Sequence, residues 1–211
     1  MSYALKEVYV TLQGEGAHAG RTAVFARFAG CNLWSGREAD RATAACWFCD
    51  TDFVGTDGPG GGRFDDAQAL AEELRRCWDA DAGPGGLPYV VFTGGEPILQ
   101  LDAAAVRACQ AVGLEVGVET NGTLPLPPGL DWVCVSPKPN SELVVRTGDE
   151  LKLVYPMEVE PQQVEGLDFA HLYLQPRDEA GQDHTAAAVD YVRRHPRWRL
   201  SLQTHKLIGI P

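Results

Sequence analysis

The chain has 211 residues, of which 45% are apolar and 22% charged, so it can bury a sizeable core and is not an intrinsically disordered segment. Its 18 basic and 29 acidic residues give a net charge of −11, which repels a phosphate backbone or an anionic membrane surface. Nucleic acid and membranes are therefore not expected as direct partners.

The start of the chain and its cysteine content indicate the compartment. Residues 1–13 lack the apolar core of a signal peptide, and no run of about 18 apolar residues occurs anywhere in the chain. We therefore expect a cytoplasmic protein with a single domain over residues 1–211. Because the cytosol keeps thiols reduced, the six cysteines are expected to be buried, catalytic or metal-bound rather than paired in disulfides.

Strand and helix patterns alternate along the chain. Several of the β-rich runs are continuously apolar, as in strands that are covered on both faces. In chain order, we expect strands at 8–12, 24–29, 89–92, 115–119, 132–135, 150–154, 172–174 and 199–202, with helices at 66–78, 102–112 and 185–194. Asp65 or Asp66, and Asp102, occupy the N-cap positions of the first two helices.

This alternation predicts parallel βαβ units. The strands outnumber the long helices, and the chain is shorter than the roughly 250 residues of a complete eight-fold barrel. The expected fold class is therefore α/β, an incomplete TIM-like parallel barrel. The chemistry of such a fold lies at the carboxyl ends of its strands, where polar clusters follow Phe92, Val118 and Val135.

Three cysteines form the first candidate site. Cys46 and Cys49 make a C-x2-C pair, and Cys31 precedes them, so thiolates can converge on a metal ion or on corners of an iron–sulfur cluster. A closed zinc site would need a fourth ligand, and His18 and Cys77 do not have zinc-finger spacing. A redox dithiol would be expected in a thioredoxin-like βαβ unit, which is not the context here.

The other cysteines and the glycine-rich segment have structural interpretations. Cys77, Cys109 and Cys134 fall within helical or strand patterns and are expected to be small core residues. The glycine cluster at 58–62 lacks the Lys-Ser/Thr ending of a phosphate-binding loop. We therefore interpret it as a mobile connection before the helix at 66–78.

The turn Thr93-Gly94-Gly95-Glu96-Pro97 is the second candidate site, directly after the strand at 89–92. Paired glycines allow a ligand to approach the backbone closely, and Glu96 adds an acceptor. By itself this is equally a structural turn. Three cysteines would leave one iron of a cluster without a protein ligand. Beside such a cluster, the turn suits a ligand that is an amino acid, because the amine of that ligand needs hydrogen-bond acceptors next to the metal.

These residues resemble the radical S-adenosylmethionine superfamily, in which three cysteines hold a 4Fe-4S cluster and the amine and carboxylate of S-adenosylmethionine bind its open iron. The superfamily's usual spacing is C-x3-C-x2-C, whereas here fourteen residues separate Cys31 from Cys46. This long gap resembles one member family, the 7-carboxy-7-deazaguanine synthases. The other motifs that carry this likeness are Thr11-Leu12-Gln13-Gly14-Glu15-Gly16, Phe28-Ala29-Gly30-Cys31-Asn32-Leu33-Trp34, Cys49-Asp50-Thr51-Asp52, Glu119-Thr120-Asn121-Gly122, Val135-Ser136-Pro137-Lys138 and Gln203-Thr204-His205-Lys206.

The resemblance implies a carbon–nitrogen lyase that converts 6-carboxy-5,6,7,8-tetrahydropterin into 7-carboxy-7-deazaguanine with release of ammonia. This reaction lies on the route to queuosine and other deazapurines. The resemblance also implies a shortened barrel, a homodimer, a requirement for Mg²⁺, and an electron donor such as flavodoxin or ferredoxin.

The resemblance further assigns roles to individual positions. Cys31, Cys46 and Cys49 would hold the cluster, and Thr51 would give its hydroxyl to Mg²⁺, with Asp50 and Asp52 as alternative ligands. The expected contacts with S-adenosylmethionine are Phe48, Cys49, Asp50, Gly95, Glu96, Ser136, Pro137, Lys138, Gln175, Pro176, Arg177 and Asp178. The expected substrate contacts are Leu12, Gln13, Gly14, Glu15, Arg27, Thr93, Glu119, His205 and the terminal carboxylate of Pro211.

Structural alternatives remain open for some of these positions. Arg27 would then form an ion pair at the barrel mouth with an acidic neighbour such as Glu15 or Glu119, and Glu119 would help to shape the turn that follows it. His205 would be a solvated residue of the tail. For the whole protein, the alternatives are a zinc-stabilised α/β binding protein and an activating enzyme that uses the same radical chemistry on a protein glycine.

Overall fold

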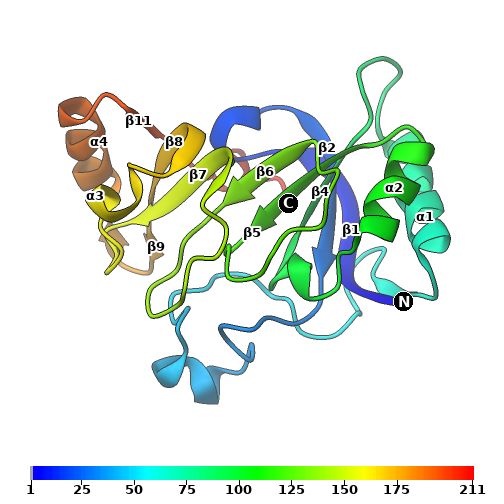
Figure 1. Ribbon diagram of the computed structural model, residues 1–211, viewed down its shortest axis with the longest axis horizontal. Helices are drawn as coiled ribbons and strands as arrows, with labels where there is room; N and C mark the ends of the chain where they lie inside the picture. The colour runs from blue at the N-terminus through cyan, green and yellow to red at the C-terminus, as the bar shows by residue number, and fades with distance from the viewer. Residues whose placement is uncertain (1) are drawn as a thin grey trace.

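The computed structural model describes residues 2–211 and is built on a nine-stranded sheet with the order β11-β8-β7-β6-β5-β4-β2-β1-β3 (Figure 1). Its strands are β1 (Tyr3–Leu12), β2 (Thr22–Phe28), β3 (Gly62–Phe64), β4 (Tyr89–Gly94), β5 (Glu115–Thr120), β6 (Trp132–Val135), β7 (Thr147–Tyr155), β8 (Asp168–Pro176) and β11 (Trp198–Leu200). Neighbouring strands from β2 to β11 pair in parallel. The expected incomplete parallel barrel is therefore confirmed, and β1 and β3 extend it as an antiparallel edge.

Helices cover the sheet in two groups (Figure 1). Helices α1 (Ala67–Asp81) and α2 (Ala103–Ala111) lie side by side near β1 and β5, whereas α3 (Pro161–Val164) and α4 (Thr185–Arg194) lie at the β8 and β11 end. The 3₁₀ helices η1 (Gly16–His18), η2 (Glu38–Thr43) and η3 (Pro97–Leu99), the short hairpin β9 (Asp178–Glu179) and β10 (Gln182–Asp183), and α5 (Thr204–Ile208) complete the structure. Within residues 2–211, none of the helices has the length and apolar character needed to cross a membrane.

Alternation along the strands separates the core from the barrel interior. In β4, Val90 and Phe92 belong to the core beneath α1 and α2, and in β7, Leu151 and Leu153 belong to the core beneath α4. Because successive side chains of a strand point to opposite faces, the residues between them face the barrel interior. Polar side chains lie on this interior face near the carboxyl-terminal ends of the strands. Their positions are fixed because the apolar residues beside them in each strand are buried in the core.

The predicted helix starts are confirmed. Asp66 caps α1 by accepting a hydrogen bond from the Ala69 amide at 2.9 Å, and Asp102 caps α2 by accepting one from Ala105 at 2.9 Å. The predicted strands also exist, but β1 begins at Tyr3, earlier than expected, because its first residues pair with β3.

The glycine-rich segment at 58–62 differs from its prediction. The Gly58 amide donates to the Lys6 carbonyl at 2.9 Å, and the Val8 amide donates to the Pro59 carbonyl at 2.8 Å. A Cβ atom at Gly61 would lie 2.1 Å from the Lys6 carbonyl oxygen. The segment is therefore a turn packed against β1, and its glycines permit backbone-to-backbone contact instead of making a loose connection.

The two N-caps provide a test of the fold. We expect Asp66→Ala to lower the free energy of unfolding by about 1 kcal/mol, the usual effect of losing an N-cap. Asp102→Ala should cost more, about 2 kcal/mol, because the buried Tyr3 hydroxyl donates to Asp102 Oδ1 at 2.9 Å and would also lose its acceptor. Urea denaturation of both variants measures the difference, and equal losses would contradict this double role of Asp102.

Candidate active site

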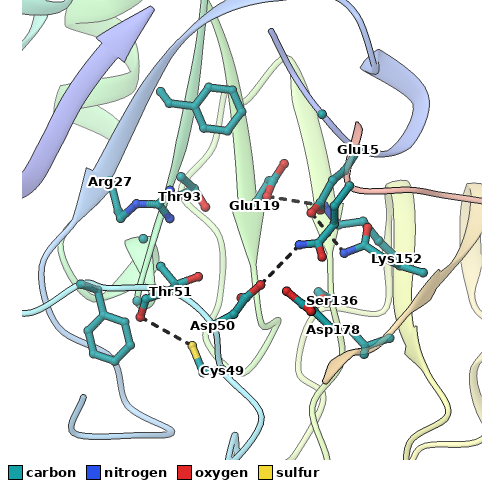
Figure 2. Close-up of a pocket in the computed structure, with 18 of the residues that line it drawn as sticks. Glu15, Arg27, Cys49, Asp50, Thr51, Thr93, Glu119, Ser136, Lys152 and Asp178 are labelled. Atoms are coloured by element: carbon teal, nitrogen blue, oxygen red, sulfur yellow. Dashed lines mark hydrogen bonds and ion pairs between the residues drawn. The ribbon is translucent and has the colours of Figure 1, made fainter. Parts of the chain in front are cut away.

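A cavity of about 400 Å³ opens at the carboxyl-terminal ends of the parallel strands (Figure 2). Residues from the ends of β2, β4, β5, β6, β7 and β8 line it, together with β1, the cysteine-containing segment after β2, and the C-terminal residues. The polar clusters that follow Phe92, Val118 and Val135 therefore meet at one site, as the sequence predicts.

Cys31, Cys46 and Cys49 all line this cavity. Cys46 and Cys49 lie in a turn in which the Cys49 amide donates to the Cys46 carbonyl at 3.4 Å. Arg41 fixes this turn, because its Nη1 donates to the carbonyls of Trp47 at 2.7 Å and Cys49 at 3.0 Å. Nothing in the sequence pattern pointed to this role of Arg41, which depends on how the segment folds back on itself.

The three thiols differ in their environments. A side-chain hydrogen bond between Cys46 and Cys49 lowers the pKa of Cys49 to about 6 and raises the pKa of Cys46. Burial raises the pKa of the Cys31 thiol. Thiolates are the form that binds metal, and Cys49 is the thiol most readily ionised in this group.

The arrangement of the cysteines fits an iron–sulfur cluster. Within residues 2–211, no three His, Cys, Asp or Glu side chains are grouped closely enough to hold a single metal ion. A cluster with several irons takes each thiolate at a different iron atom, so its ligands line a cavity wall without meeting at one point. Three soft thiolate donors on one wall are the donor set that such a cluster uses.

The glycines of the 93–97 turn bring β4 against the backbone that leads to Cys31. The Glu96 amide donates to the Gly30 carbonyl at 2.9 Å. A Cβ atom at Gly95 would lie 2.0 Å from that same carbonyl oxygen. Gly94 has a φ of +129°, a conformation that favours glycine. The turn therefore needs both glycines for close packing, and Gly95 also lines the cavity.

Glu96 has a different position from the one predicted. Its carboxylate is fully buried behind the cavity wall and accepts hydrogen bonds from Thr120 Oγ1 at 2.7 Å, the Asn121 amide at 2.8 Å and the Ile98 amide at 3.0 Å. Burial raises the pKa of Glu96, although these hydrogen bonds oppose the change. The Glu96 side chain therefore ties the end of β4 to the end of β5, instead of reaching the cavity as an acceptor for a cofactor.

Lys152 lies on the floor of the cavity between two carboxylates (Figure 2). Its Nζ lies 2.5 Å from Glu15 Oε2 and 3.5 Å from Glu119 Oε2. Lys152 belongs to no recognisable sequence motif, although a lysine between two core leucines of a strand is a signal that it faces a polar interior. Burial opposes ionisation of Glu15, but the charge and hydrogen bond of Lys152 outweigh it and lower the pKa of Glu15.

Arg27 forms an ion pair, but not with the carboxylates that the structural alternative named. Its Nε donates to Glu7 Oε1 at 2.7 Å, and its Nη2 donates to Tyr9 Oη at 3.3 Å. Glu15 and Glu119, the partners first considered, pair with Lys152 instead. Arg27 lines the cavity beside Thr93, on the side opposite Lys152 (Figure 2).

The C-terminal segment closes one side of the cavity. The Thr204 amide and hydroxyl both donate to the Gly14 carbonyl, at 3.0 and 2.8 Å. The Thr11 hydroxyl donates to a terminal oxygen of Pro211 at 2.8 Å, which holds the end of the chain beside β1. His205 and Pro211 consequently line the cavity, so His205 is not a solvated residue of a free tail.

Lys206 connects this segment to the cysteine turn. Its Nζ lies 2.6 Å from Asp50 Oδ2 and 2.5 Å from Asp178 Oδ2. Burial would raise the pKa of Asp50, but the hydrogen bond and charge of Lys206 lower it. Segments from three distant parts of the chain are therefore joined at the cavity rim.

Most of the predicted contact residues line this cavity. Those that do so are Leu12, Gln13, Gly14, Glu15, Arg27, Phe48, Cys49, Asp50, Thr51, Thr93, Gly95, Glu119, Ser136, Lys138, Gln175, Pro176, Arg177, Asp178, His205 and Pro211. Pro137, like Glu96, is not a lining residue, although its neighbours Ser136 and Lys138 are. Cys77, Cys109 and Cys134 are buried, as predicted, and Cys134 also touches the cavity floor.

Comparisons with known proteins identify the class and then the family. Residues 40–135 match the family model of the Radical SAM superfamily. The partial barrel and its three-cysteine wall thus define a radical S-adenosylmethionine enzyme with an iron–sulfur cluster. The chain is 60% identical to the 7-carboxy-7-deazaguanine synthases of Bordetella pertussis and Bradyrhizobium diazoefficiens, with both chains covered in full in each comparison. The chain belongs to the family of 7-carboxy-7-deazaguanine synthases.

A solved structure supports the same assignment. The crystal structure of QueE from Escherichia coli is similar to this chain with a TM-score of 0.68 and 26% identity, covering 97% of this chain and 95% of that one. Family membership replaces both alternatives considered for the whole protein, the zinc-stabilised binding protein and the enzyme acting on a protein glycine.

The contact between Gly14 and the C-terminal segment can be tested directly. A Cβ atom at Gly14 would lie 1.9 Å from His205 Nδ1, so Gly14→Ala must displace His205. We expect the amides of residues 204–210 to exchange hydrogen at least about tenfold faster, because local opening of this segment becomes easier. Gly62→Ala is the matched control, since nothing lies within 4 Å of a Cβ at that position. Unchanged exchange in Gly14→Ala would show that this contact does not hold the segment.

Proposed function

We propose that this chain converts 6-carboxy-5,6,7,8-tetrahydropterin into 7-carboxy-7-deazaguanine and releases ammonia. One observation carries the proposal: in a member of this family, the three cysteines and the side chains expected to bind substrate line a single cavity. The cavity volume of about 400 Å³ falls in the range that is typical of small-molecule binding sites.

Cys31, Cys46 and Cys49 would hold the 4Fe-4S cluster and leave one iron for the amine and carboxylate of S-adenosylmethionine. When bound, these groups supply a carbon radical that takes a hydrogen atom from the substrate. The chain itself provides a shielded cavity and holds the reacting groups close together. We assign S-adenosylmethionine to the wall made by residues 48–50, Gly95, 136–138 and 175–178.

The substrate would lie between Arg27 and the Lys152 floor. The planar guanidinium of Arg27 suits the substrate carboxylate, since it can donate two parallel hydrogen bonds. At the other end, Glu119, which accepts a hydrogen bond from Gln13, would present its carboxylate to the ring N–H groups. Leu12, Gly14, Glu15, Thr93, His205 and the terminal carboxylate of Pro211 would complete the substrate site.

Two further parts of the proposal rest on the family likeness alone. We infer that the enzyme is a homodimer, and that a flavodoxin or ferredoxin supplies the electron that starts the reaction. Sedimentation analysis and reduction assays with each donor type test these two statements separately.

The most direct test of the proposed function is anaerobic turnover. Purified protein with a reconstituted cluster is incubated with reductant, S-adenosylmethionine, Mg²⁺ and the carboxylated tetrahydropterin. We expect the deazaguanine product to be detected by its mass, together with ammonia. An enzyme that cleaves S-adenosylmethionine but forms no deazaguanine would contradict the substrate assignment.

Replacing any one of Cys31, Cys46 or Cys49 by Ala is expected to abolish cleavage of S-adenosylmethionine. Cys109→Ala is the control, because Cys109 lies on the buried face of α2 and does not line the cavity. Chromatographic detection of 5′-deoxyadenosine measures the outcome. Cleavage that persists in Cys31→Ala would remove this cysteine from the cluster.

Mg²⁺ is proposed to bind the Thr51 hydroxyl together with substrate oxygens, since this hard cation prefers oxygen ligands and keeps several waters. Thr51→Ala is therefore expected to weaken the stimulation of turnover by Mg²⁺, whereas Thr51→Ser should retain it. A titration of turnover against Mg²⁺ concentration measures the effect. An unchanged titration in Thr51→Ala would move the ligand to Asp50 or Asp52.

A further inference from the structure

Lys152 is a buried cation that the proposed chemistry has not yet used. It lies in β7 between Leu151 and Leu153, which are fully buried in the core beneath α4. Alternation along the strand turns Lys152 to the opposite face, where it is only 5% exposed on the cavity floor. Burying an ammonium group is costly unless charged and hydrogen-bonding partners compensate it, so its partners are informative.

Those partners are the acidic side chains expected to bind the substrate. Lys152 Nζ lies 2.5 Å from Glu15 Oε2 and 3.5 Å from Glu119 Oε2. Within residues 2–211, Lys152 is the only cationic side chain within 4.0 Å of either carboxylate. Two carboxylates that lie this close together repel each other, and the ammonium group between them offsets this repulsion.

Two glutamines orient the remaining carboxylate oxygens. Gln13 Nε2 donates to Glu119 Oε1 at 2.8 Å, and Gln175 Nε2 donates to Glu15 Oε1 at 3.1 Å. The hydroxyl of Ser201 in turn donates to Gln175 Oε1 at 3.0 Å. The carboxylates are thus fixed on both sides, by the lysine and by the amides.

We propose that Lys152 is a positioning residue that holds the carboxylates of Glu15 and Glu119 together, so that they accept hydrogen bonds from the N–H groups of the substrate's aminopyrimidinone ring. This inference rests on the proposed function, because it places one edge of the proposed pterin substrate in the same cavity. A carboxylate pair neutralised by one ammonium is an acceptor-rich surface, and the amino-oxo edge of a pterin presents N–H donors to it.

The charged groups around Lys152 determine what its removal does. Glu15, Glu119 and Cys134 face it from neighbouring elements, Glu150 lies two residues before it in β7, and His205 lies near Glu15 from the C-terminal segment. Lys152 outweighs burial and lowers the pKa of Glu15. Without Lys152, burial and the charge of Glu119 both favour the protonated form of Glu15. Such a carboxyl group binds an N–H donor poorly until the pH is high enough to ionise it.

The test compares Lys152→Met, Lys152→Arg and a matched control, Lys6→Met, in the cluster-containing enzyme. Lys6 is also buried and also contacts two carboxylates, those of Asp52 and Asp57, but it does not line the cavity. We expect Lys152→Met to raise the KM for the pterin about tenfold to a hundredfold at neutral pH, with KM falling as the pH rises. Lys152→Arg should recover much of the affinity, and Lys6→Met should show no new pH dependence of KM.

A second measurement does not depend on activity. In Lys152→Met, a folded-state pKa of Glu15 above its unfolded value makes the free energy of unfolding decrease as the pH rises from mildly acidic to neutral. The double variant with Glu15→Gln should lose the part of this slope that Glu15 contributes, whereas Glu150, whose pKa Lys152 also lowers, keeps its own contribution. This readout distinguishes two failures. If the wild type forms no deazaguanine but the slope appears, the substrate assignment fails while the pairing stands. If the wild type forms product, the inference is overturned by an unchanged KM, or by a higher KM that does not vary with pH.

Discussion

Side-chain alternation along the parallel strands is the constraint on which the site depends. β7 shows it most clearly, because Leu151 and Leu153 enter the core beneath α4 while Lys152 faces the barrel interior. The same pattern in β5 buries Val116 and Val118 and turns Glu119 toward the cavity. A shift of one residue in either strand would place the charged group in the apolar core. The burial of leucine and valine therefore fixes where the ionic groups of the site lie.

Several charged side chains of the cavity form ion pairs, although the chain as a whole carries a net charge of −11. Lys152 contacts Glu15 and Glu119, Arg27 contacts Glu7, and Lys206 bridges Asp50 and Asp178. Each pair joins segments that are distant in the sequence or adjacent in the sheet. Of these pairs, Lys206 and Asp50 are the farthest apart in the sequence, because they join the C-terminal helix to the turn that carries Cys49. These ion pairs assemble the cavity from parts of the chain that local sequence does not connect.

The sequence predicted those features that depend on local pattern or on spacing. The caps at Asp66 and Asp102, the parallel strands and the convergence of polar strand ends all follow from short-range rules. The three cysteines were found because their spacing and the family likeness both single them out. Features that depend on tertiary partners were missed or misplaced. Glu96 looks like a ligand acceptor in its turn, but Thr120 at the end of β5 and Asn121 just after it donate hydrogen bonds to its carboxylate.

Lys152 was missed for a related reason. Its position in β7 marks it as interior, but the two carboxylates that give it a role come from the loop after β1 and from β5. Arg27 illustrates the same limit, since its acidic partner proved to be Glu7 on the antiparallel neighbour β1. The register between β1 and β2 decides the partner of Arg27, and the packing of a loop against β5 and β7 decides the partners of Lys152. A single sequence contains neither.

The central claim is that Cys31, Cys46 and Cys49 leave one iron of their cluster open to S-adenosylmethionine. Electron–nuclear double resonance on the reduced enzyme, with S-adenosylmethionine labelled with oxygen-17 at its carboxylate, tests this claim most directly. The account predicts a strong hyperfine coupling between the label and the cluster. A cluster signal that shows no coupling to the label, and that does not change when S-adenosylmethionine is added, would contradict it.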